Sequence, residues 1–318
     1  MKGRLTTVVD VVVLALGEGT DCACDGGCSA APPSQVPPAQ SSARACGTRT
    51  PILACRDALR MASAQVETVV AHTDAEIDAA LKALPDVRLI VATAADGQLR
   101  AVMRRLVRMY APAPSKRSQA ADAIPDDRTL PDLPPIGILP LGPDSTDLVT
   151  RLGLPRGPAD VAAAVLGGKI RRLDLLRNDG GGVTLDGVLV GGVDASGSAS
   201  TFLARVEVDD AVLADGTEPV LMSVVANASR YATVDGLPLV LSPSMEDGVL
   251  DVAVAVPRAS RSLFRRPRVE IEVRRASGRA VAITPRADVP FVDDGAETTL
   301  SRKRSWWMER AAWAVYVP

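Results

Sequence analysis

The stretch Val87–Leu106 contains the residue types of a phosphate-binding turn, in the order that such a turn requires. An apolar run, 89–92, is typical of a buried strand, and apolar residues recur at helical spacing from position 99 onward. Between them stand Asp96 and Gly97. A helix N-terminus offers unpaired N–H groups and a partial positive charge, and glycine lets phosphate approach the backbone. The pattern predicts a strand, a turn and a helix. It permits phosphate at the turn, although an Asp-Gly pair alone is more often a plain turn.

The cysteines are the second group of residues that could do chemistry. All five lie in the first fifth of the chain: Cys22, Cys24, Cys28, Cys46 and Cys55. The first three could bind a soft metal, but the paired C-x2-C spacing of zinc sites is missing, and the one histidine, His72, belongs to another element. The alternative is a loop insertion that carries reduced thiols.

Length and charge limit the class of protein. A chain of 318 residues with 47% hydrophobic and 23% charged residues predicts two folded domains. A net charge of −2, with only three each of Phe, Trp and Tyr, argues against a nucleic-acid partner. No apolar run approaches the roughly 20 residues of a membrane helix. Abundant arginine, alanine and proline beside few lysines suggest a bacterial source.

The first residues, 1–19, imitate a secretion signal, with two basic residues before an apolar run. Asp10 interrupts that run and no small-residue cleavage site follows, so we expect a first strand over 6–16 instead. The expected location is the cytoplasm, with peripheral contact at the inner face of the membrane. A basic cluster, 302–304, before Trp306 and Trp307 suits such a surface; the alternative is a solvated loop and a core aromatic pair.

The first half of the chain alternates short apolar strands with amphipathic helices. The predicted elements are strand 6–16, helix 55–64, strand 66–71, helix 74–84 capped by Thr73 or Asp74, the strand and helix of 87–106, and strand 136–139. Two segments rich in Pro, Gly, Ser or Asp, 18–48 and 111–135, predict a flexible insert and a loop. Strands that alternate with helices predict an α/β domain with a parallel, doubly wound sheet and sites at the carboxyl ends of its strands.

The second half has the pattern of an antiparallel β-sandwich. After a helix at 160–166, the predicted strands are 171–177, 183–190, 204–208, 219–226, 249–256, 269–274 and 280–285, and the chain ends in a strand at 312–317. Asp186–Gly187 marks either a bulge or a turn that splits the second of these strands. The predicted domains are 1–157 and 158–300, followed by a tail, 301–318, that can return to the first domain.

Four strings in the same order resemble the catalytic family of diacylglycerol kinases, which are bacterial lipid kinases related to NAD kinases. They are PPIGILPLG through LGLP at Pro134–Pro155, GKIRRLDLLR at Gly168–Arg177, the run Val224–Ala255, and the terminal AVYVP. The resemblance covers nearly the whole chain. It implies an α/β nucleotide-binding domain followed by an antiparallel β-sandwich lipid-kinase domain, and transfer of the γ-phosphoryl group of ATP to a lipid hydroxyl with Mg²⁺, the nucleotide lying between the domains.

The resemblance assigns nucleotide binding to ten positions: Thr73, Ala94, Ala95, Asp96, Gly97, Gln98, Gly142, Ser145, Thr146 and Asp147. The family's GGDGT turn reads AADGQ here, so the acid and the following glycine remain, but methyl groups stand where the leading glycines would be. Alanine at a positive φ or against a phosphate costs on the order of 1 kcal/mol. The next loop is one residue longer than the family's GTxND, and its Pro143 removes an N–H donor.

The family's catalytic DGE motif reads Asp-Gly-Ala-Glu at 294–297, so the resemblance implies Glu297 as the base, with Asp294 of the same turn as the alternative. One added residue turns a strand side chain to the opposite face unless a bulge restores it. Asp247 matches the family's Mg²⁺ position beside backbone carbonyls, or else it is a plain hairpin-turn aspartate.

The expected function is therefore an ATP-dependent lipid kinase acting on a lipid at a membrane surface. The altered loops, and a chain shorter than the family's between 192 and 206, give the alternative. In that case the protein is a catalytically impaired pseudokinase that binds nucleotide or lipid as a regulatory protein.

Overall fold

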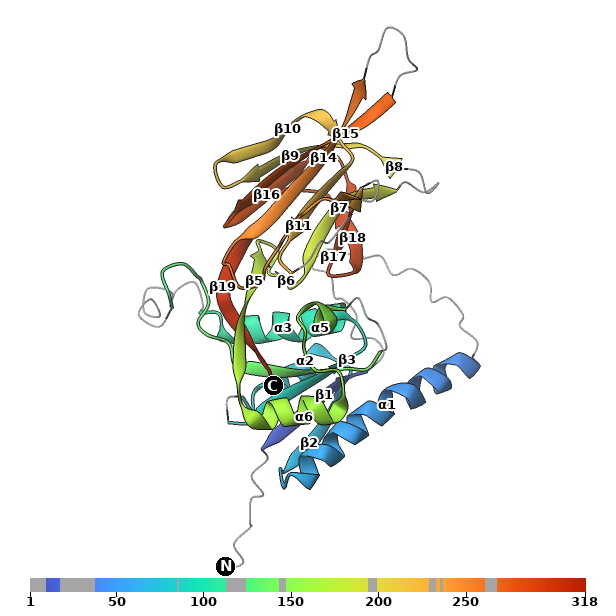
Figure 1. The fold of residues 1–318 in the computed structure, drawn as a ribbon, viewed down its shortest axis with the longest axis vertical. Helices are drawn as coiled ribbons and strands as arrows, with labels where there is room; N and C mark the ends of the chain where they lie inside the picture. Colours follow the sequence, from blue (N-terminus) through green and yellow to red (C-terminus); the bar gives the residue numbers. More distant parts are fainter. Residues whose placement is uncertain are drawn as a thin grey trace, which may run out of the picture. The chain divides into compact units, whose positions relative to one another are not determined.

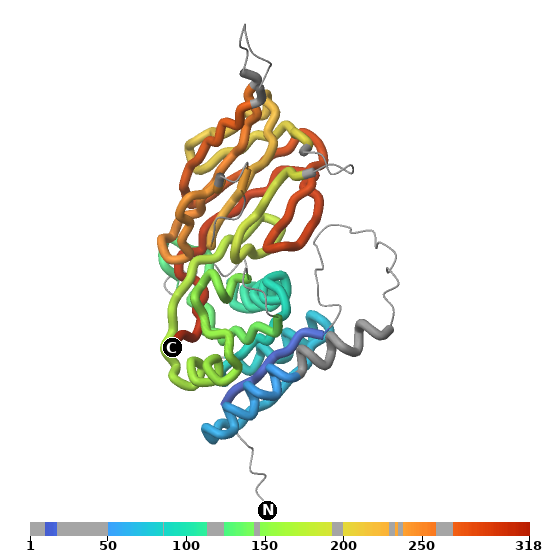
Figure 2. The backbone as a smooth tube through the Cα atoms, turned by 45° about the vertical axis from the view of Figure 1, so that its right-hand side comes forward, coloured from blue at the N-terminus to red at the C-terminus, as the bar shows by residue number. Residues whose placement is uncertain are grey.

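A computed structural model describes residues 10–17, 38–84, 86–112, 124–142, 147–193, 199–228, 233–234, 237–260 and 268–318. The chain forms two compact units, which Figure 1 and Figure 2 trace from the N- to the C-terminus. Unit 1 contains Met1–Ala123, Leu130–Leu173 and Trp313–Pro318, and unit 2 contains Ile124–Thr129 and Asp174–Ala312. The chain therefore passes from one unit to the other four times, after residues 123, 129, 173 and 312.

Unit 1 is a parallel sheet with helices on both faces (Figure 1). Its strands lie in the order β2 (Val66–Ala71), β1 (Val11–Leu16), β3 (Arg88–Thr93), β4 (Pro135–Pro140) and the end of β19 (Arg304–Tyr316). Every neighbouring pair is parallel. The central strands are apolar along their whole length because both of their faces are covered.

Apolar spacing and caps explain where the helices of unit 1 form. α1 (Pro38–Met61) and α6 (Pro158–Gly167) pack on one face of the sheet, and α2 (Asp74–Leu81) and α3 (Asp96–Tyr110) pack on the other. α6 starts with proline at its first position and ends at Gly168, which has a φ of 73°. A single turn, α5 (Leu148–Arg151), follows the loop after β4.

Unit 2 is a sandwich of two sheets. One sheet has the order β10 (Ala211–Val220), β9 (Phe202–Val208), β16 (Ala280–Pro285) and the start of β19, with β5 (Ile170–Asn178) and β6 (Val183–Thr184) attached. The other has the order β15 (Arg268–Gly278), β14 (Leu250–Ser260), β11 (Met222–Ala226), β7 (Gly187–Val193), β17 (Val289–Asp293) and β18 (Ala296–Leu300). Short pairs add β8 (Ala199–Ser200) to β7 and join β12 (Thr233–Val234) to β13 (Leu237–Pro238). Alternate residues of both sheets form one apolar core between them.

A buried carboxylate attaches the short segment Ile124–Thr129 to unit 2. Glu309 is 0% exposed, and it accepts hydrogen bonds from the Thr129 N–H at 2.7 Å and from the Trp307 indole at 2.9 Å. Arg177 lies over the Trp307 ring, 5.5 Å from its centroid. Trp306 is fully buried in the core of unit 2. Trp306 is thus a core residue, whereas Trp307 is half-buried, and membrane contact by the basic cluster 302–304 stays a prediction.

The predicted fold class, a doubly wound parallel domain followed by an antiparallel β-sandwich, is confirmed. α1 begins at Pro38, so the last residues of the segment predicted as an insert, 38–48, are helical; residues 18–37 lie outside the described residues. The turn at 185–186 splits the strand predicted over 183–190. The chain passes from unit 1 to unit 2 after Leu173, later than the predicted boundary at 157, because α6 packs against α1 inside unit 1. Among the described residues, none of the helices combines the length and the apolar composition that crossing a bilayer requires.

Candidate functional site

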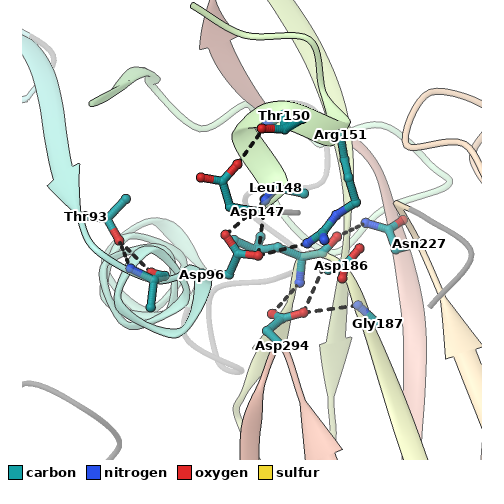
Figure 3. Close-up of polar contacts among 12 residues, drawn as sticks. Thr93, Asp96, Asp147, Leu148, Thr150, Arg151, Asp186, Gly187, Asn227 and Asp294 are labelled. Carbon is teal, nitrogen blue, oxygen red and sulfur yellow. Dashed lines mark hydrogen bonds and ion pairs between the residues drawn. The ribbon is translucent and has the colours of Figure 1, made fainter. Parts of the chain in front are cut away.

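The turn between β3 and α3 makes hydrogen bonds to its own side chains. The Ala94 N–H donates to Oε1 of Gln98 at 2.8 Å. The Ala95 N–H donates to Oγ1 of Thr93 at 3.2 Å (Figure 3). Ala95 is the N-cap of α3 and gives it no side-chain cap. The two N–H groups that would face a phosphate in a GGDGT turn therefore already have acceptors.

Asp96, the acid of this turn, holds the loop that follows β4. Its carboxylate accepts a hydrogen bond from the Leu148 N–H at 3.1 Å and forms an ion pair with Arg151 at 2.8 Å (Figure 3). Burial raises the pKa of Asp96 above its ordinary value, while the Leu148 N–H and Arg151 act in the opposite direction. The carboxylate is thus enclosed, hydrogen-bonded and paired with a cation.

Asp147 has a similar set of partners. It is the N-cap of α5, where its carboxylate accepts from the Thr150 N–H at 2.9 Å, and it pairs with Arg156 at 2.6 Å. Arg156 also donates to the Gly142 carbonyl at 2.9 Å, which anchors the start of the same loop. The structure brings together the two loops that the resemblance assigns to nucleotide, since Asp96 binds the residue next to Asp147. Ser145 and Thr146 lie outside the described residues.

Thr73 has a structural role at the start of α2. Its hydroxyl accepts from the Glu76 N–H at 3.3 Å, and the Glu76 carboxylate accepts from the Thr73 N–H at 3.1 Å, which completes a capping box. The predicted helix cap is confirmed. Nucleotide binding by Thr73 stays a prediction.

The hairpin β17–β18 separates the two candidates for a base. Val292 pairs with Glu297 and Asp293 pairs with Ala296, so the loop has two residues and no bulge. Glu297 is exposed. Asp294 is 4% exposed, and its carboxylate accepts three backbone N–H groups, those of Leu185, Asp186 and Gly187, at 2.8–3.1 Å (Figure 3). Asp294 therefore stabilises the turn between β6 and β7. Glu297, one residue later than in the family's DGE motif, is an exposed residue of β18.

The same turn is held from its other side by Asn227. The amide of Asn227 donates to the carbonyls of Asp174 and Leu185 at 3.1 and 2.8 Å, and its backbone N–H donates to the Asp186 carbonyl at 2.8 Å. The turn carries Asp186, a buried acid that sequence reasoning did not select. Its only sequence signal was the Asp-Gly pair, which indicated a break in the strand.

Asp247 is an exposed turn residue. Its carboxylate accepts from the Val249 N–H at 3.1 Å, while the neighbouring Gly248 N–H donates to buried Asp174 at 2.7 Å. Asp174 also accepts from the Ala311 N–H at 2.6 Å, and burial raises its pKa. Asp247 thus lies in a turn before β14, a strand that pairs with β11 and β15, and a role in binding Mg²⁺ stays a prediction.

The contacts of Asp96 and Asp147 do not fit a resident Mg²⁺. Magnesium is bound by carboxylate and phosphate oxygens with several waters, but Asp96 and Asp147 are each paired with a guanidinium group. Within the described ranges, no group of three or more His, Cys, Asp and Glu side chains is placed to hold a metal. A divalent cation at either acid would have to displace an arginine.

The cysteine hypotheses are tested only in part. Cys55 is buried in α1, and burial raises the pKa of its thiol to about 11, which keeps it protonated. Metal ligation requires the thiolate, so Cys55 is unsuited to it. Cys22, Cys24 and Cys28 lie outside the described residues, as does the side chain of Cys46.

Two partners of the acids in unit 1, Arg151 and Arg156, were also missed by sequence reasoning. Arg156 lies nine residues after Asp147 and beyond the end of α5, so helical spacing does not indicate that pair. The pairing of Arg151 with Asp96 spans 55 residues and has no local signal.

Comparison with known proteins agrees with this architecture. The chain is similar to a crystal structure of a diacylglycerol kinase from Bacillus anthracis str. Sterne, with a TM-score of 0.57 and 13% identity over 98% of each chain. Two further structures from that strain, described as candidate diacylglycerol kinases, have TM-scores of 0.59 and 0.60, with 14% and 13% identity over 97% and 98% of each chain. No curated protein sequence matches at a significant level. The solved structures establish the fold.

A family model gives a separate observation. Residues 42–178 match the family model of the diacylglycerol kinase catalytic domain. This segment runs from within α1 to the end of β5, and it leaves out β1 and the end of β19, which also belong to unit 1. The predicted resemblance to this family of lipid kinases is confirmed.

Proposed function

We propose that the protein is a non-catalytic member of the diacylglycerol kinase fold, which binds a lipid and does not transfer phosphoryl groups. One observation carries the proposal: the phosphate turn makes its hydrogen bonds and ion pairs within its own unit. The Ala94 and Ala95 N–H groups have side-chain acceptors, and Asp96 and Asp147 have arginine partners.

The free turn already satisfies the Ala94 and Ala95 N–H groups, which makes phosphate binding less favourable. In a turn with solvated donors, phosphate displaces only water. At this turn it would have to break two existing hydrogen bonds, each worth roughly 1 kcal/mol. It would also meet two alanine methyl groups where a glycine would leave the backbone open. Phosphoryl transfer depends on positioning and on neutralising phosphate charge with a metal, and the acids of the two nucleotide loops, Asp96 and Asp147, are already paired with arginines.

A cavity of about 470 Å³ in unit 2 suits the apolar part of a lipid. It is lined mainly by apolar groups, with Arg286 and Asp288 as its charged residues; the others include Gly191, Gly192, Phe202, Leu203, Val289 and Pro290. Gly192 has open space where a Cβ would stand, and Phe202 packs against the core of the sandwich. We propose that an acyl chain enters here while the headgroup stays near the charged residues, with the protein in peripheral contact with a membrane.

The test uses the purified full chain with radiolabelled γ-phosphate ATP, Mg²⁺ and diacylglycerol micelles. We expect no labelled lipid and no rise in melting temperature with Mg²⁺ and ATP. Changing the turn to the family's sequence with Ala94→Gly, Ala95→Gly and Gln98→Thr should bring a nucleotide-dependent rise, because it frees the Ala94 N–H and removes the methyl groups. Labelled lipid from the unchanged protein would overturn the non-catalytic assignment.

Lipid binding is tested separately by sedimentation with phosphatidylcholine vesicles, with and without diacylglycerol. We expect diacylglycerol to increase binding. Ala287→Trp should abolish the increase because Ala287 is exposed and lines the cavity, whereas Ala62→Trp, an exposed alanine of unit 1, should not. Equal binding with and without diacylglycerol would refute the lipid assignment.

The second candidate is an ATP-dependent lipid kinase. It is favoured by the match of residues 42–178 to the catalytic-domain family and by the retained Asp96–Gly97 pair. If labelled lipid forms, Asp96→Ala should abolish it, and Glu297→Ala then tests whether the shifted acid is the base.

A further inference from the structure

A second cavity, of about 480 Å³, lies in unit 1 where strands β3 and β4 begin. Its lining includes Leu84, Arg88, Tyr110, Leu133, Arg172 and Tyr316. The phosphate turn follows the other end of β3, and a strand of six residues is about 20 Å long. The cavity is therefore a separate place from the phosphate turn.

Arg88 is a fixed cation with unused donors. One of its terminal nitrogens donates to the carbonyls of Val165 and Leu166, at 2.9 and 2.8 Å, where α6 ends. In the part of the chain that the structure describes, no carboxylate lies within ion-pair distance of Arg88. The end of a helix supplies only about half a negative charge, so the guanidinium retains positive charge beside the cavity.

Two tyrosines add hydroxyl groups without partners. Tyr316 is 8% exposed and Tyr110 is half-buried, and neither hydroxyl hydrogen-bonds to a residue that the structure describes. Burial raises the pKa of both groups, so each hydroxyl stays protonated and can donate. Donors held beside an apolar cavity are suited to an acceptor on a ligand.

The rest of the lining is apolar, apart from one ion pair. Leu84 and Leu133 are buried, and Pro134 and Pro135 provide rigid walls. Arg172 pairs with Asp132 at 2.7 Å, so that pair adds no net charge. The lining as a whole carries one excess positive charge, from Arg88.

We propose that this cavity binds a small organic monocarboxylate with an apolar body. The carboxylate accepts hydrogen bonds from Arg88 and the two tyrosine hydroxyls, and the apolar body lies against the leucines and prolines. A neutral molecule of the same shape would leave the Arg88 charge without a counter-ion. An inorganic anion would leave the apolar residues of the lining exposed to water.

The experiment titrates octanoate into the full chain and follows heat and melting temperature, with octan-1-ol as the neutral probe of the same length. We expect octanoate to bind and to raise the melting temperature, and octan-1-ol to do neither. The double variant Tyr110→Phe with Tyr316→Phe keeps both rings and should weaken octanoate about tenfold or more, because hydrogen bonds to a charged acceptor are lost. Arg60→Met, at an exposed arginine of α1, is the matched control for Arg88→Met.

Location is tested with a diazirine analogue of octanoate, followed by mass spectrometry of the labelled peptides. Label on the peptides that contain Leu84, Tyr110 or Leu133 supports the proposal, and excess octanoate should remove it. Arg88→Met should abolish binding while Arg60→Met leaves it unchanged. Absence of binding, equal binding of octan-1-ol, or label confined to other peptides would each overturn the proposal.

Discussion

Two arginines determine what the acids of unit 1 can do. Arg151 and Arg156 each hold one aspartate that the family resemblance assigns to the nucleotide site. A guanidinium group keeps its charge at every physiological pH and donates in a fixed fork, so it is a durable partner for a carboxylate. At these positions the arginines neutralise the negative charge that would otherwise attract a metal ion.

The pH dependence of stability tests whether burial or the contacts with Leu148 and Arg151 have the larger effect on the Asp96 pKa. Its pKa is raised because burial outweighs the Leu148 N–H and Arg151. A carboxyl group with a raised folded-state pKa adds stability below its unfolded value and loses that contribution as pH rises through the folded-state pKa. Relative to Asp96→Asn, the unchanged protein should therefore gain unfolding free energy as pH falls from about 7 to about 4.5, measured by urea denaturation.

The direction of this change separates two physical causes. If the unchanged protein loses stability relative to Asp96→Asn on acidification, the ion pair with Arg151 dominates and the pKa is lowered. Parallel pH curves would mean that the pKa is the same in the folded and unfolded chains, which also contradicts the expectation.

At the scale of elements, the β17–β18 hairpin shows how a local turn supports a distant one. Asp294 and Gly295 have φ values of 48° and 81°, the two positive angles of a type I′ turn, for which Asp-Gly is a favoured pair. The turn places the Asp294 carboxylate against three N–H groups more than 100 residues away in the chain. The hairpin thereby sets the break between β6 and β7.

Alanine substitutions in this hairpin should have very different effects on stability. Asp294→Ala leaves three buried N–H groups without an acceptor and should lower the unfolding free energy by about 3 kcal/mol or more. Glu297→Ala, at an exposed position, should change it by less than about 0.5 kcal/mol. Denaturant unfolding of both variants checks this, and similar losses would show that Glu297 has buried contacts.

At the scale of the whole molecule, neither unit is a continuous piece of chain. The last strand, β19, begins in unit 2 and finishes in unit 1, where Ala314 and Val315 pair with the start of β4. Trp313 is fully buried there. The stability of unit 1 therefore depends on the final residues of the sequence.

A chain that ends at Ala312 should test this dependence. It lacks the strand beside β4 and one fully buried tryptophan, a loss comparable to the roughly 3–5 kcal/mol of a tryptophan truncation. We expect faster amide hydrogen exchange in β1, β3 and β4, with the β14 and β11 amides of unit 2 still protected. A chain lacking only Pro318 is the control. Unchanged protection in unit 1 would contradict the prediction.

The sequence by itself determined the features that depend on neighbouring residues. The strand, turn and helix of Val87–Leu106, the cap at Thr73 and the alternation of elements in unit 1 all follow from periodicity and turn chemistry within a short window. The four family strings then identified the order of the two domains. Residues 38–49 show no such pattern, so their helical structure was not predicted.

Only the tertiary structure decided what the candidate residues contact. Asp96 meets Arg151 across 55 residues, Asp294 meets the 185–187 turn across more than 100, and Arg88 meets the end of α6 across 77. Such pairs depend on how strands are ordered and how loops close, and residue spacing carries no record of either. The phosphate turn could be located from sequence, but the finding that the Ala94 and Ala95 N–H groups and the Asp96 carboxylate already have partners required the folded chain.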